Sequence, residues 1–120
     1  MAIARKHRRP IAVRGRQFLW WVYEDLENLG AMTLAVASAD KAFLVRYEIA
    51  QTDETRHLMV LGQEFPGLPA RRPWRRVRCP AFVAGDSVTP SHVRQLIDWC
   101  LHTNRDLVQV DWTGRDAVTG

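Results

Sequence analysis

Alternating apolar and polar positions dominate the first two thirds of the chain. Side chains of a β-strand point to opposite faces in turn, so a period of two in residues that are branched or aromatic predicts strands. Arg14 and Gly15 separate the first two runs and suggest a tight hairpin, because glycine tolerates a positive φ. The predicted strands of this antiparallel meander are residues 10–13, 16–24, 32–38, 42–50 and 56–65.

The pattern changes after residue 65. Residues 66–73 contain three prolines and a glycine, and proline cannot donate to the hydrogen-bond ladder of a central strand. We therefore expect an extended loop there. Residues 74–79 are a candidate for an edge strand, and residues 106–112 alternate enough for a last short strand.

A helix is predicted over residues 90–103. Thr89 can cap its N-terminus, and Pro90 fits the first helical position, where its missing N–H group costs nothing. Apolar residues then follow the i, i+3, i+4, i+7 and i+8 spacing of an amphipathic helix. They are Val93, Leu96, Ile97, Cys100 and Leu101.

These elements predict an α+β fold, an antiparallel meander of five to six strands with one C-terminal helix packed on one face. A chain of 120 residues has the length of one domain. We expect that domain over residues 10–113. A basic N-terminal arm at 1–9 precedes it, and a frayed C-terminal tail at 114–120 follows it.

The strand over residues 16–24 is apolar on both faces. Phe18, Trp20 and Val22 lie on its first face, and Leu19, Trp21 and Tyr23 on its second. One helix covers one face only, so the second set requires another cover, either the Pro/Arg-rich loop or a second copy or other partner. This set is a candidate dimer face, and we expect Trp21 to be mostly buried.

Composition is that of a globular protein, with 47% hydrophobic and 25% charged residues. No apolar run could span a bilayer, and the basic N-terminus lacks the apolar stretch of a signal peptide. Two cysteines, Cys79 and Cys100, are too few for a secreted disulfide framework, so reduced thiols are favoured over one disulfide. We expect a cytoplasmic protein that has no membrane partner.

Charge is segregated along the chain. Residues 5–16 and 71–78 hold 11 of the 17 basic residues and none of the 13 acidic ones, which leaves the remainder with a net charge of −7. Two basic segments on an acidic body can steer an acidic protein or a polyanion. We expect the two segments to be neighbours on one edge of the sheet.

The sequence contains no nucleophile elbow, Gly-rich phosphate loop, HExxH motif or acidic calcium loop. Asp98 and His102 lie four residues apart on the predicted helix, and we interpret them as a solvated pair rather than an acid/base dyad. A zinc site with Cys79, Cys100 and His102 is disfavoured because Cys100 belongs to the apolar stripe. We expect no enzyme activity, no cofactor and no metal.

Trp99 falls about 130° from the centre of the apolar stripe of the predicted helix. It either packs beside Trp112 under the C-terminal segment or stands exposed as an anchor for a partner. Trp99 is therefore a candidate partner-binding residue.

The stretch RRPWRRVRCP, residues 71–80, is the arginine strip. Arginines on an edge strand can protect that edge from pairing with another chain. Alternatively, they can contact phosphates while the tryptophan stacks on a base, or the same residue types can anchor an interface with an acidic protein. The candidate partner-binding residues of the strip are Arg71, Arg72, Trp74, Arg75, Arg76 and Arg78.

The frame formed by Ile11, Val13, Gly15, Arg16 and Phe18, together with VTPSHVRQLI, resembles small single-domain bacterial proteins of unassigned function. The resemblance implies a bacterial, cytoplasmic setting and transfers no catalytic residue. The leading expectation is a non-enzymatic protein-interaction module of the adaptor, inhibitor or immunity type. It would bind an acidic protein partner or a second copy of itself as a homodimer, and a small basic DNA- or RNA-binding protein is the alternative.

Overall fold

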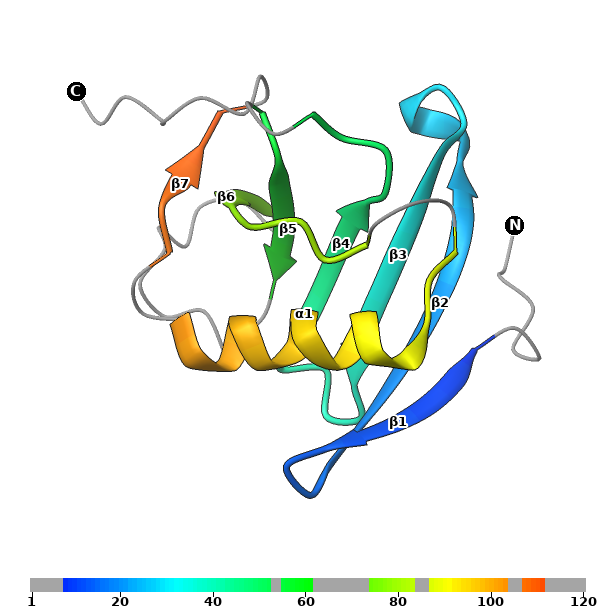
Figure 1. The fold of residues 1–120 in the computed structure, drawn as a ribbon, viewed down its shortest axis with the longest axis vertical. Helices are drawn as coiled ribbons and strands as arrows, with labels where there is room; N and C mark the ends of the chain where they lie inside the picture. The colour runs from blue at the N-terminus through cyan, green and yellow to red at the C-terminus, as the bar shows by residue number, and fades with distance from the viewer. Residues whose placement is uncertain (1–7, 53–54, 62–73, 84–86, 104–106, 112–120) are drawn as a thin grey trace.

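The computed structural model describes residues 8–52, 55–61, 74–83, 87–103 and 107–111. They form one antiparallel sheet of seven strands, paired in chain order, and one α-helix (Figure 1). The strands are β1 (Arg9–Val13), β2 (Arg16–Asp25), β3 (Ala31–Ser38), β4 (Leu44–Glu48), β5 (His57–Leu61), β6 (Arg75–Arg78) and β7 (Gln109–Val110). The helix is α1 (Pro90–Thr103), and a short 3-10 turn, η2 (Leu26–Asn28), connects β2 to β3. The α+β meander is confirmed, with seven strands instead of five to six.

The helix α1 crosses one face of the sheet, and residues 79–83, which follow β6, run over the same face (Figure 1). Four members of its predicted apolar stripe, Val93, Leu96, Ile97 and Cys100, expose no surface, and the fifth, Leu101, is partly buried against the core. Burial of each aliphatic side chain contributes about 1.5–3 kcal/mol. The sheet residues that complete this core include Phe18, Tyr47, Leu58, Val60 and Val77.

Local sequence signals explain where α1 begins and how β1 turns into β2. The hydroxyl of Thr89 accepts a hydrogen bond from the His92 N–H at 3.4 Å, while the His92 ring accepts one from the Thr89 N–H at 3.2 Å. This reciprocal pair works as a capping box and fixes the helix start. At the β1–β2 turn, Arg14 and Gly15 have φ of 53° and 76°, which is the backbone of the expected two-residue hairpin.

The hairpin turn also contacts the helix. Arg14 Nε donates to the Asp98 carboxylate at 3.0 Å, and Arg14 Nη2 lies 3.2 Å from the His102 ring. The predicted solvated pair of Asp98 and His102 is therefore bridged by a third side chain. Both partners of the ion pair are about half exposed, so it contributes at most about 1 kcal/mol.

Two expectations about the sheet edges are wrong. The strand of the arginine strip, β6, is not an edge strand, because β7 pairs with it through Arg76 and Val77. The basic segments are not neighbours either, since β2 to β5 separate β1 from β6, a distance of roughly 24 Å at about 4.8 Å per strand. Apart from Arg8 and Arg9, the predicted N-terminal arm lies outside the described residues, as does the C-terminal tail.

Candidate functional site

We call the sheet face opposite α1 the open face, because no helix or strand of the described residues lies over it. Alternation along each strand and the pairing register decide which side chains share it. A single row of residues crosses the middle of this face, one from each strand after β1. The row is Trp21, Ala35, Arg46, Met59, Arg76 and Val110.

The open face unites two sets of residues that the sequence presented separately. Arg76 and Arg78 alternate with the buried Val77, so both point away from α1. Trp74 belongs to the same surface, because the Arg46 guanidinium lies 4.4 Å from the centre of its ring. The candidate dimer face of Leu19, Trp21 and Tyr23 lies on the open face by the same alternation.

The rest of the arginine strip is not part of this surface. Arg75 pairs with Val60, which is buried under α1, so Arg75 lies on the helix side of the sheet. Arg71 and Arg72 lie outside the described residues. Of the six candidates in the strip, Trp74, Arg76 and Arg78 are therefore the ones that the structure brings together on the open face.

Trp21 is mostly buried, as expected, although it does not belong to the closed core. The guanidinium of Arg8 lies 4.4 Å from the centre of its ring. This stack repeats the one between Arg46 and Trp74, and each is worth about 0.5–1 kcal/mol at an exposed site. The covers expected for Trp21 were the Pro/Arg-rich loop or a partner, and the contact with Arg8 was not foreseen. Burial raises the pKa of the neighbouring Tyr23.

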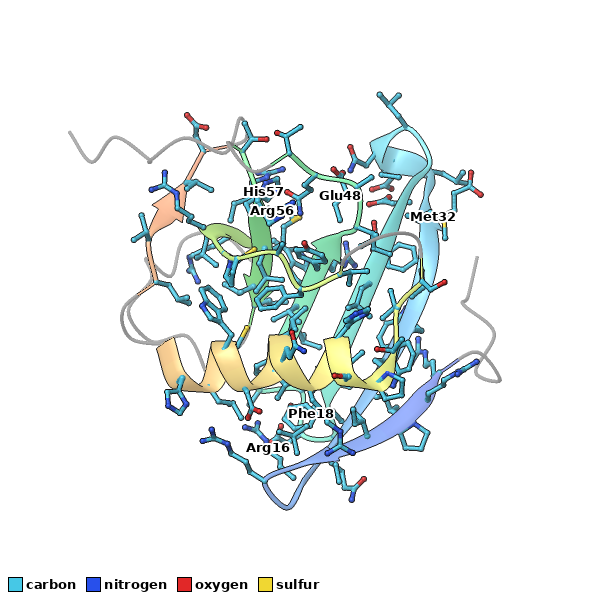
Figure 2. The ribbon with its side chains drawn as sticks, in the orientation of Figure 1. Arg16, Phe18, Met32, Glu48, Arg56 and His57 are labelled. Carbon is cyan, nitrogen blue, oxygen red and sulfur yellow. The ribbon has the colours of Figure 1, made fainter. Side chains whose placement is uncertain are left out.

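A cavity of about 580 Å³ opens at one end of this face. Arg46, Arg76 and His57 line one side of it, and Met59 lies between the two arginines. The acidic residues of its lining are Asp25, Glu27 and Glu48. Figure 2 shows Glu48 and His57 at the same end of the sheet as Met32, near the connection from β2 to β3. The cavity thus carries both signs of charge.

The two arginines of the cavity, Arg46 and Arg76, have no carboxylate partner in the part of the chain that the structure describes. Glu48 is occupied by a hydrogen bond from the side-chain amide of Asn28, and the Asp25 carboxylate accepts from the Glu27 N–H at 3.2 Å. Asp25 and Glu48 thus each accept a hydrogen bond from the turn between β2 and β3, and neither pairs with Arg46 or Arg76.

The groups best suited to covalent chemistry lie in the core. Cys79 and Cys100 are buried and free of a disulfide, as expected. Burial raises the pKa of Cys79 to about 12 and that of Cys100 well above its usual range, so both thiols stay protonated at neutral pH. No cluster of three or more His, Cys, Asp or Glu side chains that could hold a metal ion occurs in the part of the chain that the structure describes.

Trp99 lies on the helix side of the sheet, opposite Trp74, Arg76 and Arg78. Its ring packs edge-on against Phe82 at 5.7 Å, and Phe82 packs in the same way against Tyr47 at 5.4 Å. This chain of three rings links α1 to the sheet, so Trp99 supports the core while staying partly exposed. Trp112, its expected neighbour, lies outside the described residues.

Sequence reasoning missed Arg8, Arg46 and Met59 as members of the candidate site. A signal was present for Arg46, which interrupts the apolar run FLVRYEI at a position that must face away from Val45 and Tyr47. Leu26 and Leu29 were missed as well. They are 77% and fully exposed in the turn between β2 and β3.

Comparison with protein-family models, curated proteins and solved structures finds no match to this chain. Among the described helical residues, none form a segment long and apolar enough to cross a membrane.

Proposed function

We propose that this chain is a non-enzymatic protein-interaction module whose open face binds an acidic segment of a partner protein. The observation that carries the proposal is the arrangement around Met59, where Arg46 and Arg76 flank an apolar side chain and lack carboxylate partners among the described residues. Trp74, stacked on Arg46, adds a large apolar surface. Arginine, tryptophan and methionine are the residue types enriched at protein interfaces.

Charge on the same surface favours a protein segment over a nucleic acid. Asp25, Glu27 and Glu48 line the cavity beside the two arginines. A phosphate backbone has one sign of charge only, so it would be repelled along that wall. A protein segment can place a carboxylate on the arginines and an apolar or basic group on the wall, and such complementarity gives specificity.

The proposed module is of the adaptor, inhibitor or immunity type and works in the cytoplasm. Thiols such as Cys79 and Cys100 stay reduced in that compartment. Binding needs no cofactor, because guanidinium groups and aromatic rings recognise a carboxylate-bearing chain directly.

Selection of a displayed random-peptide library on the immobilised protein tests the proposal. We expect the selected peptides to be enriched in Asp and Glu next to Leu or aromatic residues. Binding should weaken at least about tenfold, or about 1.4 kcal/mol, in the variants Arg46→Glu and Arg76→Glu. The matched control is Arg94→Glu, because Arg94 is exposed on α1. Peptides without acidic enrichment, or peptides that bind Arg76→Glu as well as the wild type, would contradict the proposal.

A nucleic-acid-binding protein is the second candidate, favoured by Arg76 and Arg78 alternating along β6 next to the ring of Trp74. Contacts from Arg46, Arg76 and Arg78 to a single strand imply a slope of log affinity against log salt of roughly −2. Micromolar or tighter binding of mixed-sequence single-stranded DNA at about 150 mM salt, lost in Arg76→Glu and kept in Trp74→Ala, would favour this candidate over the first.

A further inference from the structure

The turn between β2 and β3, residues 25–30, is the hairpin tip. It carries the two most exposed large apolar side chains of the described residues, Leu29 with full exposure and Leu26 with 77%. A surface leucine alone needs no explanation, but two on one turn form an apolar projection.

The hairpin tip has a fixed shape. Asp25 accepts a hydrogen bond from the Glu27 N–H through its side chain at 3.2 Å, and from the Gly30 N–H through its backbone carbonyl at 2.8 Å. The side chain of Asn28 donates to the Glu48 carboxylate on β4. These bonds hold the turn against the sheet, so the leucines project from a rigid support and are pre-organised for contact.

The backbone of Leu29 is strained. Its φ of 55° lies in the left-handed region, which costs a residue with a β-carbon about 1–2 kcal/mol. Glycine or asparagine would occupy this position more easily. Full exposure means that no packing within the chain offsets the strain. A leucine that is unfavourable in the isolated chain points to a contact with another molecule.

The charges around the tip define what it can contact. The charged residues of the tip are Asp25 and Glu27, and Glu24 directly precedes them, so all are acidic. An anionic membrane would repel it. The complementary surface is basic and apolar, and on the open face Arg46, Arg76 and the side chains of Met59 and Trp74 provide that combination beside the acidic wall of the cavity.

We propose that two copies of this chain form a homodimer in which the hairpin tip of each copy docks into the open face of the other. The tip does not neutralise the arginines of its own copy. Asp25 and Glu27 already line the cavity, yet Arg46 and Arg76 have no ion pair among the described residues. A two-fold axis beside this rim brings each tip onto the opposite face and closes the assembly. The inference rests on the proposed function, since it names a second copy as the acidic partner of the same surface.

Sedimentation equilibrium of the purified chain tests whether it associates and through which residues. We expect a monomer–dimer equilibrium that Leu29→Asn weakens at least tenfold. The matched control is Lys41→Asn, because Lys41 has a φ of 60° in the turn between β3 and β4 but presents no apolar side chain. Equal weakening by both variants, or by neither, would overturn the inference, and circular dichroism verifies that each variant is folded.

A charge exchange tests the contact itself. Glu27→Arg places two positive groups at each contact of a homodimer, and Arg76→Glu places two negative groups there, so each variant alone should sediment as a monomer. Mixed together, the two variants have opposite charges at both contacts and should pair. Fluorescence anisotropy of one labelled variant titrated with the other measures this pairing. Mixed variants that fail to pair, while the wild type dimerises, would overturn the inference.

The two proposals can fail separately. A wild type that stays monomeric up to about 1 mM, the weak end of specific affinities, excludes the homodimer. Acidic peptides selected in the library experiment would still support the proposed function in that case. If instead the mixed variants pair but no acidic peptide is selected, the tip contact stands and the general acidic-partner proposal fails.

Discussion

Replacing Leu29 with asparagine should stabilise the isolated monomer. The left-handed backbone at this position costs leucine about 1–2 kcal/mol, whereas the short polar side chain of asparagine tolerates it. The leucine side chain is fully exposed, so the substitution gives up no buried apolar area. We therefore expect the free energy of unfolding to rise by about 1 kcal/mol, which corresponds to a melting temperature about 3–6 °C higher in a domain of this length.

Urea denaturation followed by circular dichroism measures this gain, at a concentration at which the wild type sediments as a monomer. Leu26→Asn is the matched control, because Leu26 is also exposed but lies in η2 without a positive φ. It should change stability by less than about 0.5 kcal/mol. A loss of stability in Leu29→Asn beside a neutral Leu26→Asn would refute the reasoning, since it would mean that Leu29 packs within the monomer.

Tyr47→Phe should lower the free energy of unfolding by about 1 kcal/mol, because the buried hydroxyl accepts the Phe82 N–H at 3.4 Å; unchanged urea denaturation would contradict this. Trp21→Ala should cost about 1–2 kcal/mol, less than the roughly 3–5 kcal/mol of a closed core site, because Trp21 is partly exposed and packs on Arg8; a loss above about 3 kcal/mol would show a fuller cover. The native Cys79 thiol should resist alkylation at pH 8, and rapid alkylation of the native protein would contradict this. The free energy of unfolding should fall between pH 9 and about 12, because the unfolded thiol ionises at its ordinary pKa of 9.0 while the folded thiol stays protonated up to a pKa of about 12.

Sequence reasoning succeeded where the signal is local. The helix over 90–103 follows from a cap, a proline and an apolar stripe that lie within the helix or directly before it. The hairpin at Arg14 and Gly15 follows from one glycine between two alternating runs. These signals need no knowledge of which strands are neighbours.

The sheet edge and the open face depend on pairing between distant segments. β7 has two residues, and α1 lies between it and its partner β6 in the sequence. Alternation within such a short segment could not show that β7 covers the edge of β6. Alternation does show that Trp21 and Arg76 avoid the core, but only the register places them in one row with Arg46 between them. The separation of Arg75 from Arg76 follows from alternation alone, and the pairing of Arg75 with the buried Val60 identifies its face as the helix side.

The hairpin tip could not be predicted for a different reason. Leu26 and Leu29 in LENLG have the composition of buried residues, and neither is a residue type that favours a left-handed backbone. The structure shows a turn held by Asp25 and Asn28 that turns both leucines outward. Residue propensities describe which side chains stabilise a given backbone conformation in the isolated chain. They therefore do not predict a leucine in a left-handed turn.

Nuclear magnetic resonance of the indole N–H groups tests directly whether the open face is a binding surface. The protein is titrated with a selected acidic peptide, and each indole signal is assigned with a Trp→Phe variant. We expect the signals of Trp21 and Trp74 to shift, because both rings lie on the open face beside Arg8 and Arg46. The signals of Trp20, which is buried under α1, and of Trp99, which packs on Phe82, should stay in place. Shifts at Trp99 with unchanged signals from Trp21 and Trp74 would contradict this expectation.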